Sequence, residues 1–313
     1  MTDLSIIIPV YNEEPNIKTL LSRLHGVLDK MQIKVELLFV NDGSTDNTIH
    51  LIKESAVADA SVKYIDFSRN FGHQVAVSAG LDHCSGKAVV IIDADLQDPP
   101  ELIETLYKKY KEGFEVVYAR RLNRSGEGAL KKLTARYFYR LLQQITTISI
   151  PVDTGDFRII DRKVVDILKQ MPEREKYLRG QIAWVGFNQT YIEYNREARN
   201  AGNTGYTYRK MLRFALDGIT SFSNFPLKFA TIMGFTVSLI SFFVMLYALY
   251  SRFISHSYVA GWASLMLSVL FIGGVQLICV GIIGEYISRI SANVRNRPLY
   301  VVKEMLLDSS QRS

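Results

Sequence analysis

The prediction of the fold starts from the stretch Val89-Val90-Ile91-Ile92-Asp93-Ala94-Asp95-Leu96-Gln97-Asp98-Pro99-Pro100. Its first four residues are all β-branched, which is typical of a strand buried on both faces of a sheet. Two carboxylates, a carboxamide and a pair of prolines follow directly. Ligands of open α/β sheets bind beyond the carboxyl ends of the strands, so we expect Asp93, Asp95 and Gln97 to lie in a binding crevice.

The two aspartates have the chemistry of a divalent metal site. Side chains alternate with period two along an extended chain, so Asp93 and Asp95 should share one side of it. Paired carboxylate oxygens suit Mg²⁺ or Mn²⁺, and such an ion would hold the diphosphate of a substrate. The alternative is that both are strand-end and turn residues, with Asp98-Pro99-Pro100 opening the next helix, because Asp-x-Asp is a short pattern with many chance matches.

Strand and helix patterns alternate from the start of the chain up to this stretch. The earlier apolar segments end in polar turns, and Asn12 is placed to cap the helix that follows the first of them. This alternation predicts an α/β fold with a doubly wound, right-handed, mostly parallel sheet covered on both faces. The expected strands are 4–10, 35–40, 62–67 and 89–92, and the expected helices end near 31 and span about 74–82.

Carboxylates follow the first, second and fourth expected strands, as Glu13, Asp42 and Asp93. The first strand is not followed by Gly-x-Gly-x-x-Gly, and no Gly-x-x-x-x-Gly-Lys-Ser/Thr occurs, so the sequence supports neither a dinucleotide-dependent dehydrogenase nor a P-loop enzyme. Acidic acceptors suit recognition of a base and ribose, and a metal suits a diphosphate. The pattern therefore favours a nucleotide site of another kind.

Two long segments near the end of the chain lack Asp, Glu, Lys and Arg. One of more than twenty residues lies between Lys228 and Arg252, and one of about thirty lies between Arg252 and Glu285. Each is long enough to cross a bilayer core of about 30 Å, which predicts two transmembrane helices, and the alternative is a buried hairpin in a soluble core. Basic residues flank the pair on its outer ends, so we expect an integral membrane protein with the catalytic part and both termini in the cytoplasm.

The charge distribution and the cysteine content argue against nucleic-acid binding, a thiolate metal site and a disulfide. Much of the net charge of +6 lies next to the apolar segments, as expected for a surface that meets anionic lipids. The sequence has no basic run with interleaved aromatic residues, so nothing in it indicates nucleic acid as a partner. The two cysteines, Cys84 and Cys279, are too few for a thiolate metal site, and their positions make a disulfide implausible.

Four motifs in order resemble the family 2 glycosyltransferases of GT-A fold, a Rossmann-like architecture. They are 8–13 (Ile-Pro-Val-Tyr-Asn-Glu), 41–46 (Asn-Asp-Gly-Ser-Thr-Asp), 69–72 (Arg-Asn-Phe-Gly) and 93–101 (Asp-Ala-Asp-Leu-Gln-Asp-Pro-Pro-Glu). Together with the paired apolar segments, they resemble more narrowly the polyisoprenyl-phosphate glycosyltransferases, which include dolichol-phosphate mannose synthases and bacterial bactoprenol glucosyltransferases. Asn41 departs from the second aspartate of many relatives, whereas Asp42 is retained.

The resemblance implies a site that takes a nucleotide-sugar. Asp93 would hold ribose or metal, and Asp95 with Gln97 would ligate Mg²⁺ or Mn²⁺. Arg120, at the end of an expected strand 115–119, is a further candidate for donor binding. For Tyr11 the alternative is plain packing. The residues expected to line the base and ribose pocket are Pro9, Tyr11, Glu13 and Asp42.

A second set of candidates concerns the acceptor. The segment 153–162 resembles the acidic motif on the acceptor side of the family, with Asp156 as the substrate contact and Asp161 as a helix cap. Lys131 and Arg136 on a basic helix are candidates for binding a lipid phosphate, although that helix could equally be a solvated face. Arg199 matches the phosphate-contacting arginine of the family, and the alternative for its segment is a linker.

These observations divide the chain into four parts. We expect residues 1–200 to form a GT-A catalytic domain, 201–227 to form juxtamembrane interfacial helices, 228–287 to form the transmembrane pair, and 288–313 to form a cytosolic tail. The sequence from Tyr208 onward predicts a helix with an apolar face opposite a basic one, as interfacial helices have.

The resemblance implies an inverting, metal-dependent transfer of one hexose to a polyprenyl (undecaprenyl) phosphate at the cytoplasmic membrane face. Asp95, Asp156 and Arg199 would carry the reaction, with Asp156 positioning the acceptor because a phosphate monoester is already largely dianionic. UDP-glucose is the first choice of donor, ahead of GDP-mannose and a UDP-aminoarabinose derivative. A processive polysaccharide synthase and a non-catalytic nucleotide-sugar-binding adaptor are the alternatives. A homo-oligomer and a separate downstream flippase are the expected partners.

Overall fold

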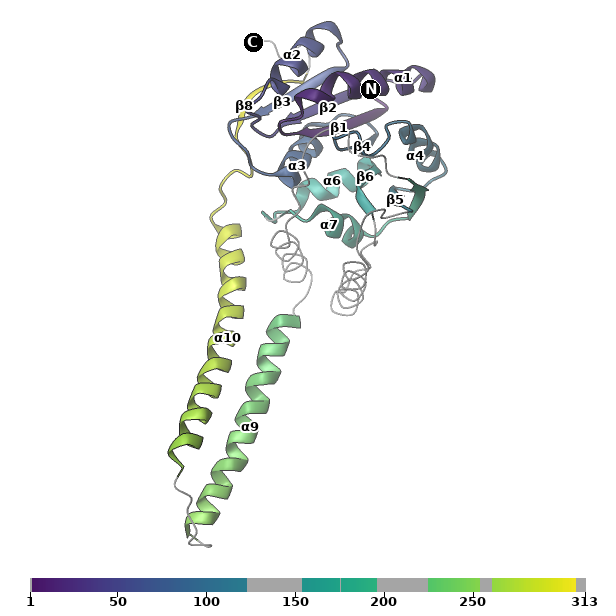
Figure 1. Cartoon of the computed structure of the whole chain (residues 1–313). Helices are drawn as coiled ribbons and strands as arrows, with labels where there is room; N and C mark the ends of the chain where they lie inside the picture. Colours follow the sequence, from purple (N-terminus) through teal and green to yellow (C-terminus); the bar gives the residue numbers. More distant parts are fainter. Residues whose placement is uncertain (1, 123–153, 175, 196–224, 254–260, 308–313) are drawn as a thin grey trace. The chain divides into compact units, whose positions relative to one another are not determined.

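The computed structural model describes residues 2–122, 154–174, 176–195, 225–253 and 261–307. Two compact units contain these residues. The first holds the described residues up to 195 together with 297–307, and the second holds 225–253 and 261–296. Figure 1 shows the elements of both units along the chain.

The first unit is built on one eight-stranded sheet with the order β7-β5-β6-β4-β1-β2-β3-β8. Its centre, β4-β1-β2-β3, is parallel throughout. Strands β6 and β8 run antiparallel to their neighbours, and β7 is parallel to β5. The strands are β1 (Leu4–Val10), β2 (Val35–Asn41), β3 (Val62–Phe67), β4 (Ala88–Ile91), β5 (Val116–Arg121), β6 (Thr154–Asp161), β7 (Gln189–Tyr194) and β8 (Val302–Leu306).

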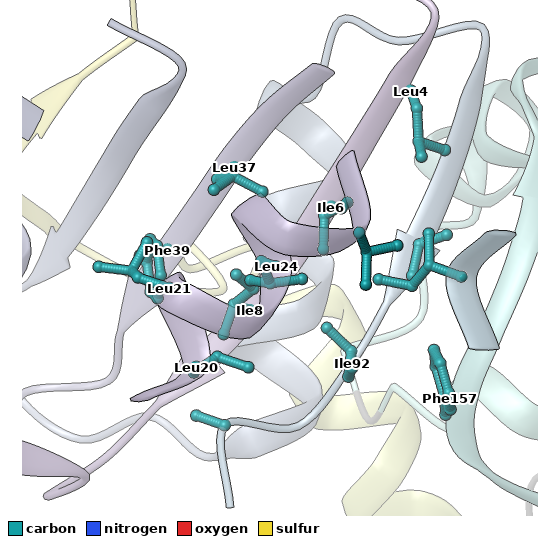
Figure 2. Packing of buried hydrophobic residues seen from close by; sticks show 14 of the residues in the cluster. Leu4, Ile6, Ile8, Leu20, Leu21, Leu24, Leu37, Phe39, Ile92 and Phe157 are labelled. Carbon is teal, nitrogen blue, oxygen red and sulfur yellow. The ribbon is translucent and has the colours of Figure 1, made fainter. Parts of the chain in front are cut away.

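Helices cover both faces of this sheet, because the central strands are apolar on both sides. Side chains of α1, α2 and α4 pack with Leu4, Ile6 and Ile8 in one core, part of which Figure 2 shows. Side chains of α3, α6 and α7 pack with Ile7 and Leu38 on the other face. The helices are α1 (Glu14–Met31), α2 (Thr48–Ala58), α3 (His73–His83), α4 (Leu102–Lys111), α6 (Arg162–Gln170) and α7 (Leu178–Val185).

The expected α/β architecture is confirmed, and the position of β6 adds to it. The sequence suggested a fifth strand, 115–119, after the fourth, but β6 lies between β4 and β5 and runs antiparallel to both. In this register Arg158 lies opposite Ile91. The segment around Asp156 therefore reaches the edge of the sheet at which the acidic loop after β4 begins.

The C-terminal tail is part of the sheet. The sequence predicted no strand in the tail 288–313, whereas β8 pairs with β3 from Tyr64↔Leu306 to Phe67↔Val302. Lys53 and the hydroxyl of Tyr64 both bind the carboxylate of Glu304. The pairing closes one edge of the sheet, which would otherwise expose unpaired backbone groups.

The second unit contains two long helices, α9 (Phe225–Phe253) and α10 (Trp262–Val294). Segments Pro226–Val244 and Phe271–Val294 are long and apolar enough to cross a membrane, and neither is buried within the protein. The two helices touch, since the Cys279 thiol lies 3.7 Å from the carbonyl oxygen of Ala230. Exposed apolar helices of this kind differ from the buried core hairpin that was the alternative.

Candidate functional site

The first two loops at the carboxyl edge of the sheet are tied to each other. The amide of Asn12 donates to Ser44 Oγ at 2.9 Å, and the amide of Thr45 donates to Asn12 Oδ1 at 2.8 Å. Asn12 has a left-handed φ of 55°, and Glu13 occupies the cap position of α1, so the predicted capping role of Asn12 is wrong. Its side chain instead holds the β2–α2 turn beside the end of β1.

Three of the four predicted pocket residues lie along this edge at the end of β1. Pro9 is buried and pairs with Val40, beyond the last residue of β1 that pairs with β4, so its missing N–H costs no bond on that side. Tyr11 is 47% exposed, which rules out plain core packing. The carboxylate of Glu13 accepts a 2.6 Å bond from Asn16 Nδ2.

Asp42, the fourth, is buried and binds the next loop. Its Oδ1 accepts the amide of Phe71 at 2.6 Å, and its Oδ2 accepts the amide of Gly72 at 2.9 Å. Burial raises the pKa of Asp42, and the two amides partly oppose that rise. Gly43 has φ +67°, and a Cβ there would lie 2.6 Å from the backbone nitrogen of Asn70. The close approach requires glycine and brings the 69–72 loop against Asp42.

The acidic stretch after β4 does not continue as a strand. β4 ends at Ile91, residues 94–95 form a turn, and Leu96 has a left-handed φ of 58°. Asp95 Oδ1 accepts the amide of Gln97 at 3.1 Å, which closes the turn. The argument that Asp93 and Asp95 share one side of an extended chain is therefore wrong, and the turn brings their charges together instead.

Burial and neighbouring charges shift the pKa of Asp93. Burial raises its pKa to about 6, Asp156, Asp98 and Asp95 add to the rise, and His73 opposes it. Nε2 of His73 lies 3.6 Å from Asp93 Oδ1. Among the described residues, Asp93 Oδ1 is buried and has no hydrogen-bond partner. A cation at this oxygen would relieve both the desolvation and the repulsion.

Asp156 lies in the opposite environment, among cations. Its Oδ1 is 2.9 Å from Nε of Arg179 and 3.3 Å from Nη2 of Arg158, and its Oδ2 is 3.2 Å from Nε2 of His73. Burial alone would raise the pKa of Asp156, but Arg179, His73 and Arg158 hold it well below its usual range. Asp156 therefore stays ionised and is a weak proton acceptor.

His73 connects the two carboxylates. Burial opposes its charge, but Asp93 and Asp156 outweigh that effect and raise the pKa of His73 to about 9. His73 is the first residue of α3 and follows directly on the 69–72 motif. Neither His73 nor Arg179 is predicted from the sequence, although the position of His73 beyond the end of a strand is an available signal.

The end of β5 supplies Arg121 to the acidic loop. Nη2 of Arg121 is 3.5 Å from Asp98 Oδ2, and the hydroxyl of Tyr194 donates to Asp98 Oδ1. The predicted residue, Arg120, instead lies over the ring of Tyr191 and 3.7 Å from Glu193. Successive strand residues face opposite sides of a sheet, so only one of the two arginines can reach the loop. Asp98, expected only to open a helix, is fully buried in this cluster.

A divalent cation fits this donor set when a ligand supplies the remaining oxygens. In the part of the chain that the structure describes, no three His, Cys, Asp or Glu side chains are grouped so that they could hold a metal ion. Mg²⁺ is commonly bound by one or two carboxylates together with substrate phosphates. Asp93 Oδ1, which is buried and accepts no hydrogen bond among the described residues, suits that arrangement together with the nearby Asp95 and Gln97.

Three predicted phosphate-binding residues, Lys131, Arg136 and Arg199, lie outside the described residues. The same is true of most of the expected juxtamembrane segment, 201–224. The described site therefore consists of the loops that follow β1, β2 and β3, the acidic turn after β4 and the cluster around Asp156.

Comparisons with known proteins all point to one family. The profile of Glycosyl transferase family 2 matches residues 5–168. An uncharacterized glycosyltransferase of Bacillus subtilis (strain 168) is 51% identical over 300 residues, which cover 96% of this chain and 93% of that protein. The bactoprenol glucosyl transferase of Shigella phage SfII is 43% identical over 301 residues, which cover 96% of this chain and 97% of that protein.

Proposed function

The chain belongs to glycosyl transferase family 2, and from that premise we propose that it transfers one glucose from UDP-glucose to a polyprenyl phosphate. One observation carries the choice of acceptor and sugar. The similarity to a bactoprenol glucosyl transferase covers 96% of the chain, so it includes the two apolar helices as well as the catalytic unit. A soluble nucleotide-sugar and a membrane-bound lipid phosphate would then meet at the cytoplasmic surface, with α9 and α10 spanning the bilayer.

On the donor side, the edge formed by Tyr11, Glu13 and the loop that Asp42 binds would take the base and ribose. Asp93 and Asp95, with Gln97, would hold Mg²⁺ or Mn²⁺. When bound, the ion would neutralise the negative charge that develops on the leaving nucleoside diphosphate. The oxygen Oδ1 of Asp93, which is buried and accepts no hydrogen bond among the described residues, supports this assignment.

On the acceptor side, the lipid phosphate oxygen attacks the anomeric carbon. A bond forms between that carbon and the phosphate oxygen, and the bond to the UDP oxygen breaks with its electron pair leaving on UDP. The second pKa of a phosphate monoester is about 6, so the nucleophile needs no strong base. Asp156, whose pKa lies well below its usual range, would position the acceptor and accept no proton. Direct displacement inverts the anomeric configuration.

The proposal is tested with membranes that contain the full chain, radiolabelled UDP-glucose and undecaprenyl phosphate. The expected product is a lipid that carries one glucose. A polymer would indicate a processive synthase, and absence of any labelled product would indicate an adaptor; both outcomes contradict the proposal. GDP-mannose and a UDP-aminoarabinose derivative in parallel reactions decide the sugar, since a faster reaction with either would overturn the choice of glucose.

A further inference from the structure

The part of the C-terminal tail that directly precedes β8 lies against the start of the loop 69–72, here called the donor-side loop. The β3–β8 ladder ends with Phe67 opposite Val302. One further bond follows, in which the amide of Ser68 donates to the carbonyl oxygen of Val301 at 3.0 Å. Ser68 is the residue that precedes the 69–72 motif. The tail therefore holds the chain at the point where the donor-side loop leaves the sheet.

Aromatic side chains extend this attachment into the loop. The ring of Tyr300 stacks on Phe67 with centroids 5.1 Å apart and an interplanar angle of 18°. Phe67 in turn meets Phe71 edge to face at 5.6 Å. Phe67 is buried between the tail and the loop. Removal of the Tyr300 ring would open space on one side of Phe67 and loosen its contact with Phe71.

Tyr300 also binds the far end of the helix that follows the loop. Its hydroxyl donates to Asp82 Oδ2 at 3.1 Å and lies 3.2 Å from Nε2 of His83. Asp82 and His83 are the last residues of α3. The tail thus contacts the segment 68–83 at both ends, before the loop and at the end of the helix.

The segment 68–83, which the tail contacts at both ends, contains residues of the candidate site. The amides of Phe71 and Gly72 bind Asp42, and His73 lies between Asp93 and Asp156. A shift of the loop would change the Asp42 contacts first, because they are the direct link between the loop and β2. The tail is the segment that follows α10 in the chain.

We propose that Tyr300 is a positioning residue for the donor site. Through Phe67 and the Ser68 attachment, the tail after the second apolar helix holds the 69–72 loop against Asp42 and keeps the nucleotide pocket in its binding shape. The inference rests on the proposed function for its kinetic consequence, whereas its structural consequence, protection of the loop, is independent of any substrate.

The test compares three variants of the full chain in detergent or nanodiscs. Tyr300→Ala removes the stack and the hydroxyl, Tyr300→Phe keeps the stack, and Met305→Ala is the matched control on β8, where the side chain is 47% exposed. Loss of an aromatic stack should increase hydrogen exchange in 68–72 and the donor KM by about three- to tenfold each in Tyr300→Ala, with kcat changed less than about twofold. Tyr300→Phe should show a smaller effect, and Met305→Ala none.

Two results would overturn the inference. One is unchanged exchange of 68–72 in Tyr300→Ala, and the other is a fall in kcat at unchanged donor KM. If Tyr300→Ala does not fold, Tyr300→Leu, which removes the aromatic ring but keeps an apolar side chain, decides the matter by whether exchange in 68–72 rises above that of Met305→Ala. If the wild type transfers no glucose at all, the proposed function fails, but the exchange measurement still decides the role of Tyr300.

Discussion

At the scale of single residues, two partly buried carboxylates of the site, Asp93 and Asp156, differ in their surroundings. Burial and the neighbouring carboxylates raise the pKa of Asp93 to about 6 although His73 opposes the rise, whereas Arg179, His73 and Arg158 hold the pKa of Asp156 below its usual range. Environments that push two pKa values apart commonly mark groups with different roles. Here they favour cation binding at Asp93 and acceptor positioning at Asp156.

Asp95→Ala should abolish transfer and leave the fold intact, because the residue lies in a turn beyond the end of β4. Loss of a group that stabilises charge on the leaving diphosphate costs about 100- to 1000-fold in rate. Initial rates with radiolabelled UDP-glucose measure this, and a chelator should reproduce the loss in the wild type. Asp29→Ala, on an exposed position of α1, is the control. Undiminished wild-type rates after thorough EDTA treatment would rule out the metal role.

Asp42→Ala should weaken donor binding more than turnover. The substitution removes both acceptors of the Phe71 and Gly72 amides, so the loop at the base pocket loses its attachment to β2. Hydrogen bonds to a charged group are worth about 1.5–3 kcal/mol, which corresponds to a donor KM about 10- to 100-fold higher. Rates at varied UDP-glucose and saturating acceptor separate KM from kcat. A collapsed kcat at unchanged KM would contradict this role.

At the scale of elements, antiparallel β6 is what completes the site. It pairs with β4 so that Arg158 lies opposite Ile91, and it carries Asp156 to the acidic turn. Arg179 on α7 and His73 on α3 then reach the same carboxylate from two other segments. Three elements that are distant in the sequence thus define the environment of Asp156.

The opposite end of the sheet has a buried carboxylate that ties several elements together. Glu36 on β2 accepts bonds from Ser5 Oγ on β1, Lys63 Nζ on β3 at 2.8 Å and the Ser85 amide at 2.5 Å. Burial alone would raise the pKa of Glu36, but Lys63, Ser5 and Ser85 lower it. A carboxyl group whose pKa is lower in the folded state contributes stability above its unfolded pKa, and this contribution is lost as the pH falls through the folded pKa.

Glu36→Gln should therefore destabilise the protein by about 1–3 kcal/mol at pH 7 and flatten its loss of stability between about pH 5 and 3. Thermal unfolding of the full chain in detergent across this pH range measures both effects. Glu54→Gln, at an exposed position of α2, is the matched control. A Glu36→Gln protein with the pH profile of the wild type would show that another group causes the acid sensitivity.

At the scale of the whole molecule, the two apolar helices should anchor the enzyme and not carry the sugar across the membrane. Between Lys228 and Glu285 the only Asp, Glu, Lys or Arg in the sequence is Arg252. A path for a polar solute normally needs buried ionisable or polar groups, whereas small residues such as Gly273 and Gly274 suit helix packing. The glycosylated lipid would then need a separate flippase.

Sealed vesicles that contain the purified protein, with UDP-glucose outside, test this. Product should stay in the outer leaflet, where an added membrane-impermeant probe reaches it. Protein-free vesicles preloaded with the glycolipid give the spontaneous rate of movement between leaflets. If product reaches the inner leaflet faster than the glycolipid does in the protein-free vesicles, the anchoring model is wrong.

The sequence alone determined the features that depend on local pattern. Apolar runs predicted β1, β2, β3 and β4 within a residue or so, because a buried strand shows its two apolar faces in any short window. The long segments without charged residues in α9 and α10 can likewise be recognised in a short window of the sequence. The four motifs named the family and placed Tyr11, Asp42 and Asp93 at the edge of the sheet where the structure has them.

Only the tertiary structure decided which of these groups meet. The insertion of β6, the pairing of β8 with β3, the choice of Arg121 over Arg120 and the contacts of His73 depend on strand order and on loops that are far apart in the chain. The turn at Asp95 and the burial of Asp98 also could not be predicted from the local sequence. The energies of such contacts come from packing and desolvation by distant segments, and no window of the sequence contains both partners.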